Sequence, residues 1–140
     1  MPKQIGILIV EDDLKDQKFI LRALNKADEN LQIEIAKDAE CALEVLKNGS
    51  NPRIIVTDLN MPGMGGRGLL DVLKSDDRFK NIPTIVLSTS ENETDVDDSY
   101  SRKANAYMVK PDSVAGYQKV ASLLNEFWLK EVKLPRASTN

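Results

Sequence analysis

Apolar runs and amphipathic stretches alternate along the chain, and this pattern repeats five times. Continuous apolar runs, rich in β-branched residues, predict strands at residues 5–10, 53–57, 83–87 and 106–109. Residues 31–36 alternate between apolar and polar side chains, which is typical of a half-exposed strand. The stretches after these strands have apolar residues at helical spacing and predict helices at 14–27, 39–47, 67–74, 91–102 and 113–128.

A strict strand-helix order with right-handed connections predicts an α/β fold with a doubly wound, five-stranded parallel sheet. In such sheets ligands bind beyond the carboxyl ends of the strands. Four of the five predicted strands end in polar or charged residues, which are Glu11-Asp12-Asp13, Asp58, Ser88-Thr89 and Lys110. We therefore expect these side chains to share one rim of the sheet.

The composition excludes several kinds of chemistry. The 140 residues contain no histidine and one cysteine, Cys41, which argues against a Ser-His-Asp triad, a zinc site and an internal disulfide. The net charge of −3 argues against nucleic acid as a partner. No apolar run is long enough to cross a membrane, and no signal peptide is evident, so we expect a cytoplasmic protein.

The predicted rim combines the groups needed for phosphoryl chemistry. Clustered carboxylates repel one another unless a cation joins them, and all-oxygen ligands favour a hard ion such as Mg²⁺. A carboxylate such as Asp58 can attack phosphorus to give an aspartyl phosphate. Lys110 can neutralise a phosphoryl oxygen, and the Ser88 hydroxyl can donate a hydrogen bond to another.

The chain resembles the receiver domain of two-component response regulators over nearly its whole length. The matching segments are 8–12, 58–63, 86–90 and 104–111, each at a predicted strand end. The resemblance implies a flavodoxin-like (βα)5 fold with strand order 2-1-3-4-5. It also implies that Asp58 is the phosphoacceptor, and that Mg²⁺ is held by Glu11, Asp12, Asp58 and the backbone carbonyl of Asn60.

Further roles follow from the same resemblance. Ser88 would be the switch hydroxyl, Tyr107 the switch aromatic residue, and Lys110 the contact to the phosphoryl group. The peptide bond between Lys110 and Pro111 would be cis. Two positions depart from the family pattern: Gly65-Gly66 stands where Asp-Gly is usual, and Lys103 stands where Gly often serves a left-handed backbone.

The C-terminal region carries more apolar residues than one helix face can bury. Phe127, Trp128 and Leu129 are consecutive, and neighbours on a helix lie about 100° apart. We therefore expect an exposed apolar surface and a homodimer through the face formed by the fourth helix, fifth strand and fifth helix. Residues 127–135, together with 86–90, also resemble the single-domain receivers that partner bacterial and cyanobacterial phytochromes.

The predicted function is that of a single-domain response regulator, which is a signalling protein rather than an enzyme. A sensor histidine kinase, a phytochrome in the narrower resemblance, would phosphorylate Asp58, and the output would be altered binding to a protein or phosphotransfer partner. We expect a receiver domain at 1–134, a tail at 135–140, and no attached DNA-binding module.

Three alternative functions fit the sequence less well. A haloacid dehalogenase-type phosphatase needs a second Asp where Asn60 stands, and Glu11-Asp12-Asp13 would repel the phosphate of a flavin in a flavodoxin-like redox protein. A pseudo-receiver that is never phosphorylated is disfavoured by the intact acidic pair and Lys110.

Overall fold

The computed structural model describes residues 5–135, in which strands and helices alternate as predicted. The strands are β1 (Ile5–Val10), β2 (Ile33–Ala36), β3 (Pro52–Thr57), β4 (Thr84–Ser88) and β5 (Ala106–Val109). The helices are α1 (Leu14–Ala27), α2 (Ala39–Lys47), α3 (Gly65–Ser75), α4 (Glu93–Ser101), α5 (Val114–Ser122) and the segment η1 (Leu123–Glu131) that continues α5. No described helix is long and apolar enough to cross a membrane. Of the predicted tail, only Pro135 lies within the described residues.

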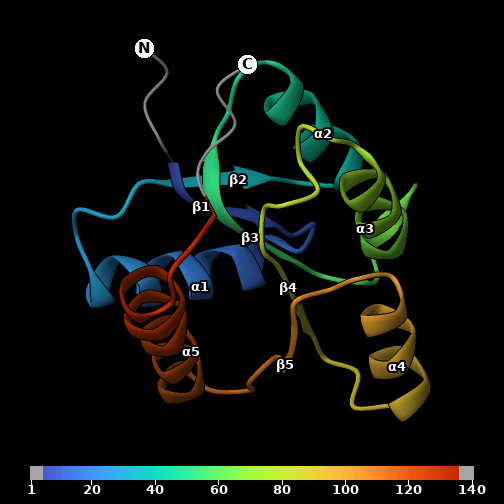
Figure 1. The fold of residues 1–140 in the computed structure, drawn as a ribbon. Coiled ribbons are helices and arrows are strands. Elements are labelled where there is room, and N and C mark those ends of the chain that lie inside the picture. The colour runs from blue at the N-terminus through green and yellow to red at the C-terminus, as the bar shows by residue number, and fades with distance from the viewer. Residues whose placement is uncertain (1–4, 136–140) are drawn as a thin grey trace.

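The strands form one parallel sheet in the order β2-β1-β3-β4-β5, which confirms the predicted fold. Helices α1 and α5 cover one face, and α2, α3 and α4 cover the other (Figure 1). Thr57 on β3 lies beside Val10 on β1 and Val86 on β4. This register brings the residues that follow β1 and β3, and the last residue of β4, to one rim of the sheet.

Apolar packing on both faces holds the strand ends in place. The core under α1 and α5 contains Ile7, Ile9, Val56 and Leu124, and the core on the opposite face contains Leu8, Val10, Ile55 and Leu69. Because alternate residues of a strand point to opposite faces, β1 and β3 contribute to both cores. A continuous apolar run is therefore the sequence expected for each of these central strands.

Side-chain caps fix where several helices begin. Asp38 caps α2 as predicted, and of the two candidates for the last helix it is Ser113 that caps α5. The predicted start of α4 at residue 91 was too early, because the Asn92 side chain accepts a hydrogen bond from the backbone N–H of Thr94 and caps the helix there.

The last predicted helix changes its winding. After α5 the chain continues as a π-helical segment, η1, in which Val132 N–H donates to the Phe127 carbonyl five residues earlier. Leu124 and Leu129, also five residues apart, are both buried. This winding therefore directs Leu129 into the core and leaves Phe127 53% exposed, as the excess of apolar residues predicted.

Two of the unusual positions have a defined backbone role. Lys103 has a φ of 76° and so adopts the left-handed conformation that Gly adopts at lower cost. Gly65 also has a positive φ, and Met64 before it makes no side-chain cap for α3. A Cβ on Gly66 would lie 2.0 Å from the Asp58 carbonyl oxygen, so only Gly fits there.

One backbone prediction was wrong. There is no cis peptide bond in residues 5–135, so the bond between Lys110 and Pro111 is trans. The trans form is the one that X–Pro bonds favour intrinsically. Lys110 reaches the site in this form, with its backbone N–H donating to the Ser88 carbonyl oxygen at 2.7 Å.

Candidate functional site

Three carboxylates meet where β1 and β3 end. Glu11 and Asp12 follow β1, Asp58 follows β3, and each contributes one oxygen to a group whose members lie within 4.8 Å of one another. Backbone amides orient two of them: Leu59 N–H donates to Asp58 Oδ1 at 2.7 Å, and Asp13 N–H donates to Glu11 Oε2 at 3.1 Å. Glu11 and Asp58 are buried, whereas Asp12 is exposed.

This acidic group fits a hard divalent cation. Its ligand atoms are all carboxylate oxygens, and an exposed Asp12 leaves one side open to water or to a further ligand. Burial raises the pKa of Glu11 to about 7, although a hydrogen bond from Lys110 opposes this shift. A cation would favour the ionised form of this buried carboxyl. The donor chemistry therefore matches the prediction of a metal site.

Lys110 provides the positive charge at the same rim. Its Nζ atom lies 2.6 Å from Glu11 Oε1, 2.8 Å from Asp16 Oδ2 and 2.9 Å from Asp58 Oδ2. Burial alone lowers the pKa of the Lys110 ammonium, but its hydrogen bonds to the three carboxylates outweigh burial and leave that pKa above its ordinary value. Lys110 is therefore a fixed cation beside Asp58.

Ser88 and Tyr107 lie in a second, connected group. The Ser88 hydroxyl is buried at the end of β4 and accepts a hydrogen bond from Ser90 N–H at 3.2 Å. Tyr107 on β5 donates its hydroxyl hydrogen to the Ser90 carbonyl at 2.8 Å. The loop after β4 thus joins the two residues predicted to act as a switch.

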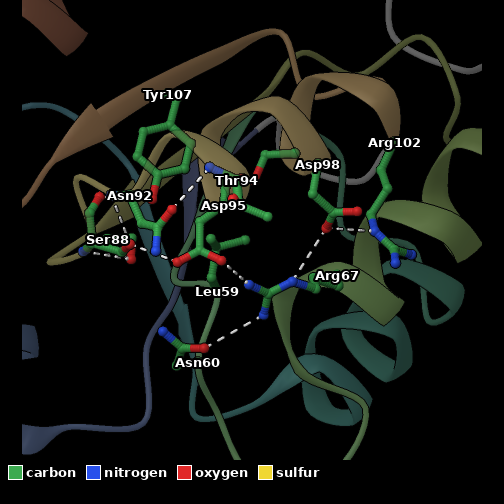
Figure 2. A network of polar contacts seen from close by, with 12 residues as sticks. Leu59, Asn60, Arg67, Ser88, Asn92, Thr94, Asp95, Asp98, Arg102 and Tyr107 are labelled. Carbon is green, nitrogen blue, oxygen red and sulfur yellow. Dashed lines mark hydrogen bonds and ion pairs between the residues drawn. The ribbon is translucent and has the colours of Figure 1, made fainter.

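Figure 2 shows that this loop is connected to α3 and α4 by charged side chains. Ser90 Oγ donates to Asp95 Oδ2 at 2.6 Å, and Arg67 on α3 pairs with the other oxygen of Asp95 at 2.8 Å. Arg67 also lies 3.2 Å from Asp98 and donates to the Asn60 side-chain oxygen at 3.4 Å. The Asn60 side chain therefore faces α3, while its predicted role concerns the backbone carbonyl.

Sequence reasoning missed Asp16 and Arg67. Both lie on helices rather than at strand ends, so the pattern of polar strand ends does not include them. Asp16 also has an ordinary explanation in the sequence, because acidic residues are favoured in the first turn of a helix. Arg67 contacts Asp95 and Asp98 of α4. These contacts depend on how the fold places α3 beside α4, so no local pattern in the sequence marks Arg67.

The sequence model of the response regulator receiver domain matches residues 7–121. The chain belongs to the response regulator receiver family. Response regulator Rcp1 of Synechocystis is 34% identical over 137 residues, which cover 94% of this chain and 93% of Rcp1. Chemotaxis protein CheY1 of Helicobacter pylori is 31% identical over 105 residues, which cover 75% of this chain and 84% of CheY1.

Solved structures of receivers are similar over nearly the whole chain. The phosphorylated cyanobacterial phytochrome response regulator RcpA has a TM-score of 0.88 and 34% identity, covering 96% of this chain and all of RcpA. The Mn²⁺-bound form of Rcp1 has a TM-score of 0.85 and 33% identity, covering 94% of this chain and 99% of Rcp1. The chain is thus a receiver that is similar to Rcp1 and to the phytochrome response regulator RcpA, and the phosphatase and redox alternatives have no support beside the receiver family.

Proposed function

We propose that Asp58 accepts a phosphoryl group and that Glu11, Asp12, Asp58 and the Asn60 carbonyl hold Mg²⁺ during the transfer. The observation that carries this proposal is the position of Asp58, which is the carboxylate shared by the acidic group and by the buried ammonium of Lys110. The receiver family and the metal-bound and phosphorylated relatives support it.

The transfer uses the residues at the rim as follows. An Asp58 oxygen attacks the phosphorus of a phosphohistidine, the new O–P bond forms, and the P–N bond breaks with its electron pair leaving on the histidine. Lys110 is placed to bind a phosphoryl oxygen because its ammonium lies 2.9 Å from Asp58 Oδ2. A bound Mg²⁺ supplies further charge neutralisation. Ser88 donates to a third phosphoryl oxygen once its loop moves toward the site.

The phosphoacceptor is tested with a small phosphoryl donor. Wild-type protein is incubated with phosphoramidate and Mg²⁺, and its intact mass is expected to rise by one phosphoryl group. The matched control is Asp58→Asn, which keeps the shape of the side chain and lacks the attacking oxygen anion. Absence of the mass gain in the wild type, or an equal gain in Asp58→Asn, contradicts the assignment.

The proposed donor is a sensor histidine kinase, which meets this protein in the cytoplasm, and the phytochrome-type relatives favour a phytochrome kinase. The output is altered binding to a protein partner or transfer to a phosphotransfer protein, without enzymatic turnover of a separate substrate. We place the receiver domain at 1–134. Transfer of radiolabelled phosphate from an autophosphorylated phytochrome kinase, lost in Asp58→Asn, tests the donor.

We also propose a homodimer through the face that contains α4, β5 and the last helix. Exposed apolar side chains come from each of these elements: Tyr100 from α4, Val109 from β5, and Leu123 and Phe127 from η1. Sedimentation equilibrium measures the association. Phe127→Ser is expected to weaken it, while Leu14→Ser, which removes an exposed apolar side chain at the start of α1, outside α4, β5 and the last helix, is the control. A wild-type monomer at high concentration contradicts the dimer.

A further inference from the structure

The ammonium of Lys110 is shared among three carboxylates. An ammonium has three N–H donors, and the three acceptors here are Glu11, Asp16 and Asp58, at 2.6, 2.8 and 2.9 Å. The Lys110 side chain is only 5% exposed, so its donors are directed to these acceptors rather than to bulk water. A phosphoryl oxygen can bind Lys110 only if one of the present partners gives way.

The three carboxylates that contact Lys110 differ in which other positive charge can neutralise them. Glu11 and Asp58 belong to the group of carboxylates that fits a divalent cation, and a cation there offsets the loss of Lys110. Asp16 does not belong to that group. It reaches the ammonium from the first turn of α1, and its second oxygen lies 3.5 Å from the Tyr117 hydroxyl on α5. Lys110 is therefore the one full positive charge that Asp16 contacts among the described residues.

The excess of negative charge at the rim also makes Lys110 important for binding a phosphoryl group. Glu11, Asp12, Asp16 and Asp58 supply four carboxylates around one ammonium. A phosphoryl donor brings further negative charge to this rim and needs the ammonium that Asp16 holds. Asp16 thus opposes the transfer although it lies outside the proposed metal site.

We propose that Asp16 is a positioning residue that restrains Lys110 and slows phosphorylation of Asp58. This inference rests on the proposed function of Asp58. Because Asp16 acts through Lys110, its effect requires the lysine. Loss of the Asp16 charge releases one donor of the ammonium for the phosphoryl group and makes the transfer faster.

The test compares two variants that remove one charge from the same helix turn. Asp16→Asn keeps the side-chain shape, and Asp13→Asn is the matched control because Asn is as good a helix N-cap as Asp. Phosphorylation by phosphoramidate with Mg²⁺ is followed by intact mass. Asp16→Asn is expected to react about fivefold faster than wild type, the size expected for one partly exposed ion pair, and Asp13→Asn to react at the wild-type rate.

A double-mutant cycle separates restraint of Lys110 from simple charge repulsion. In a Lys110→Ala background, Asp16→Asn is expected to leave the rate unchanged, because the residue through which it acts is missing. A persistent acceleration in that background, an equal acceleration by Asp13→Asn, or a slower Asp16→Asn protein each overturns the role of Asp16 alone. Wild-type protein that gains no phosphoryl mass overturns the proposed function and this inference together.

Discussion

Lys110 Nζ and Asp58 Oδ2 lie 2.9 Å apart although 52 residues separate them in the sequence. Lys110 follows β5, Asp58 follows β3, and β4 lies between these strands. The lysine reaches across the end of β4, where its backbone N–H is held by the Ser88 carbonyl. The parallel sheet thus fixes the distance between the proposed nucleophile, Asp58, and the Lys110 cation.

Lys110→Ala is expected to slow phosphorylation of Asp58 by about 100-fold, because it removes a preorganised cation from the developing phosphoryl charge. The rate is measured by intact mass after addition of phosphoramidate and Mg²⁺. Lys119→Ala, which removes an exposed lysine on α5, is the control. Equal rates for Lys110→Ala and Lys119→Ala would contradict the assignment of Lys110 to the phosphoryl group.

Much of the fold follows from local patterns in the sequence. Buried strands in a parallel sheet need apolar side chains on both faces, so the runs around Ile7 and Ile55 predicted β1 and β3 closely. Glu11 and Asp58 are the polar residues that follow these runs, and both were predicted as site residues on that ground. Because all strands run parallel, strand-end residues necessarily gather at one rim, and the acidic group was predictable on that ground.

Other features depend on contacts between elements and are not encoded in a local pattern. Asp16 contacts Lys110 only because α1 and β5 are brought together by the fold. Arg67 meets Asp95 across two helices in the same way. The π winding of η1 depends on the position at which the Leu129 side chain packs into the core. The Leu129 carbonyl oxygen also accepts a hydrogen bond from Arg53 on β3.

Lys103→Gly is expected to raise the free energy of unfolding by about 0.5 to 1 kcal/mol. The left-handed backbone at φ 76° costs an L-residue about 1–2 kcal/mol, and the greater unfolded-state entropy of Gly offsets part of the gain. Urea unfolding followed by circular dichroism measures the change. Lys103→Ala keeps the strain and serves as the control. A Gly variant no more stable than the Ala variant would contradict this account.

The stability of the metal-free protein is expected to fall as pH rises from about 4.5 to about 7. The pKa of Glu11 is about 7 in the folded protein against 4.5 for the ordinary carboxyl, chiefly because the group is buried. Between these values the folded protein holds a proton that the unfolded chain has released, so raising the pH favours unfolding.

Between pH 5.5 and pH 7.5 the expected loss in free energy of unfolding is on the order of 2 kcal/mol. Urea unfolding in EDTA at pH 5.5 and pH 7.5 measures it. Glu11→Gln removes the titrating group and should flatten the profile. The carboxyls of Asp38, Asp76 and Asp98 do not interfere, because their pKa values are lowered and they titrate below this window. A wild-type profile as flat as that of Glu11→Gln would refute the role of Glu11.

Arg67→Ala is expected to loosen α4 without unfolding the rest of the protein. Within α4 only Ser99 is fully buried, so apolar packing contributes little to holding this helix. Arg67 contacts Asp95 and Asp98, and both ion pairs are lost in the variant. Amide hydrogen exchange in α4 should become about tenfold faster, which corresponds to about 1.4 kcal/mol of local opening free energy.

Exchange in α1, which packs against the opposite face of the sheet (Figure 1), should stay unchanged and serves as an internal reference. Arg78→Ala breaks an exposed ion pair with Asp76 and is the control for loss of an arginine that does not contact α4. Because the Arg67 pairs are partly exposed, high salt should bring the wild-type exchange closer to that of the variant. If α4 exchanges at the wild-type rate in Arg67→Ala, packing rather than charge holds the helix, and the polar network of Figure 2 is not what fixes α4.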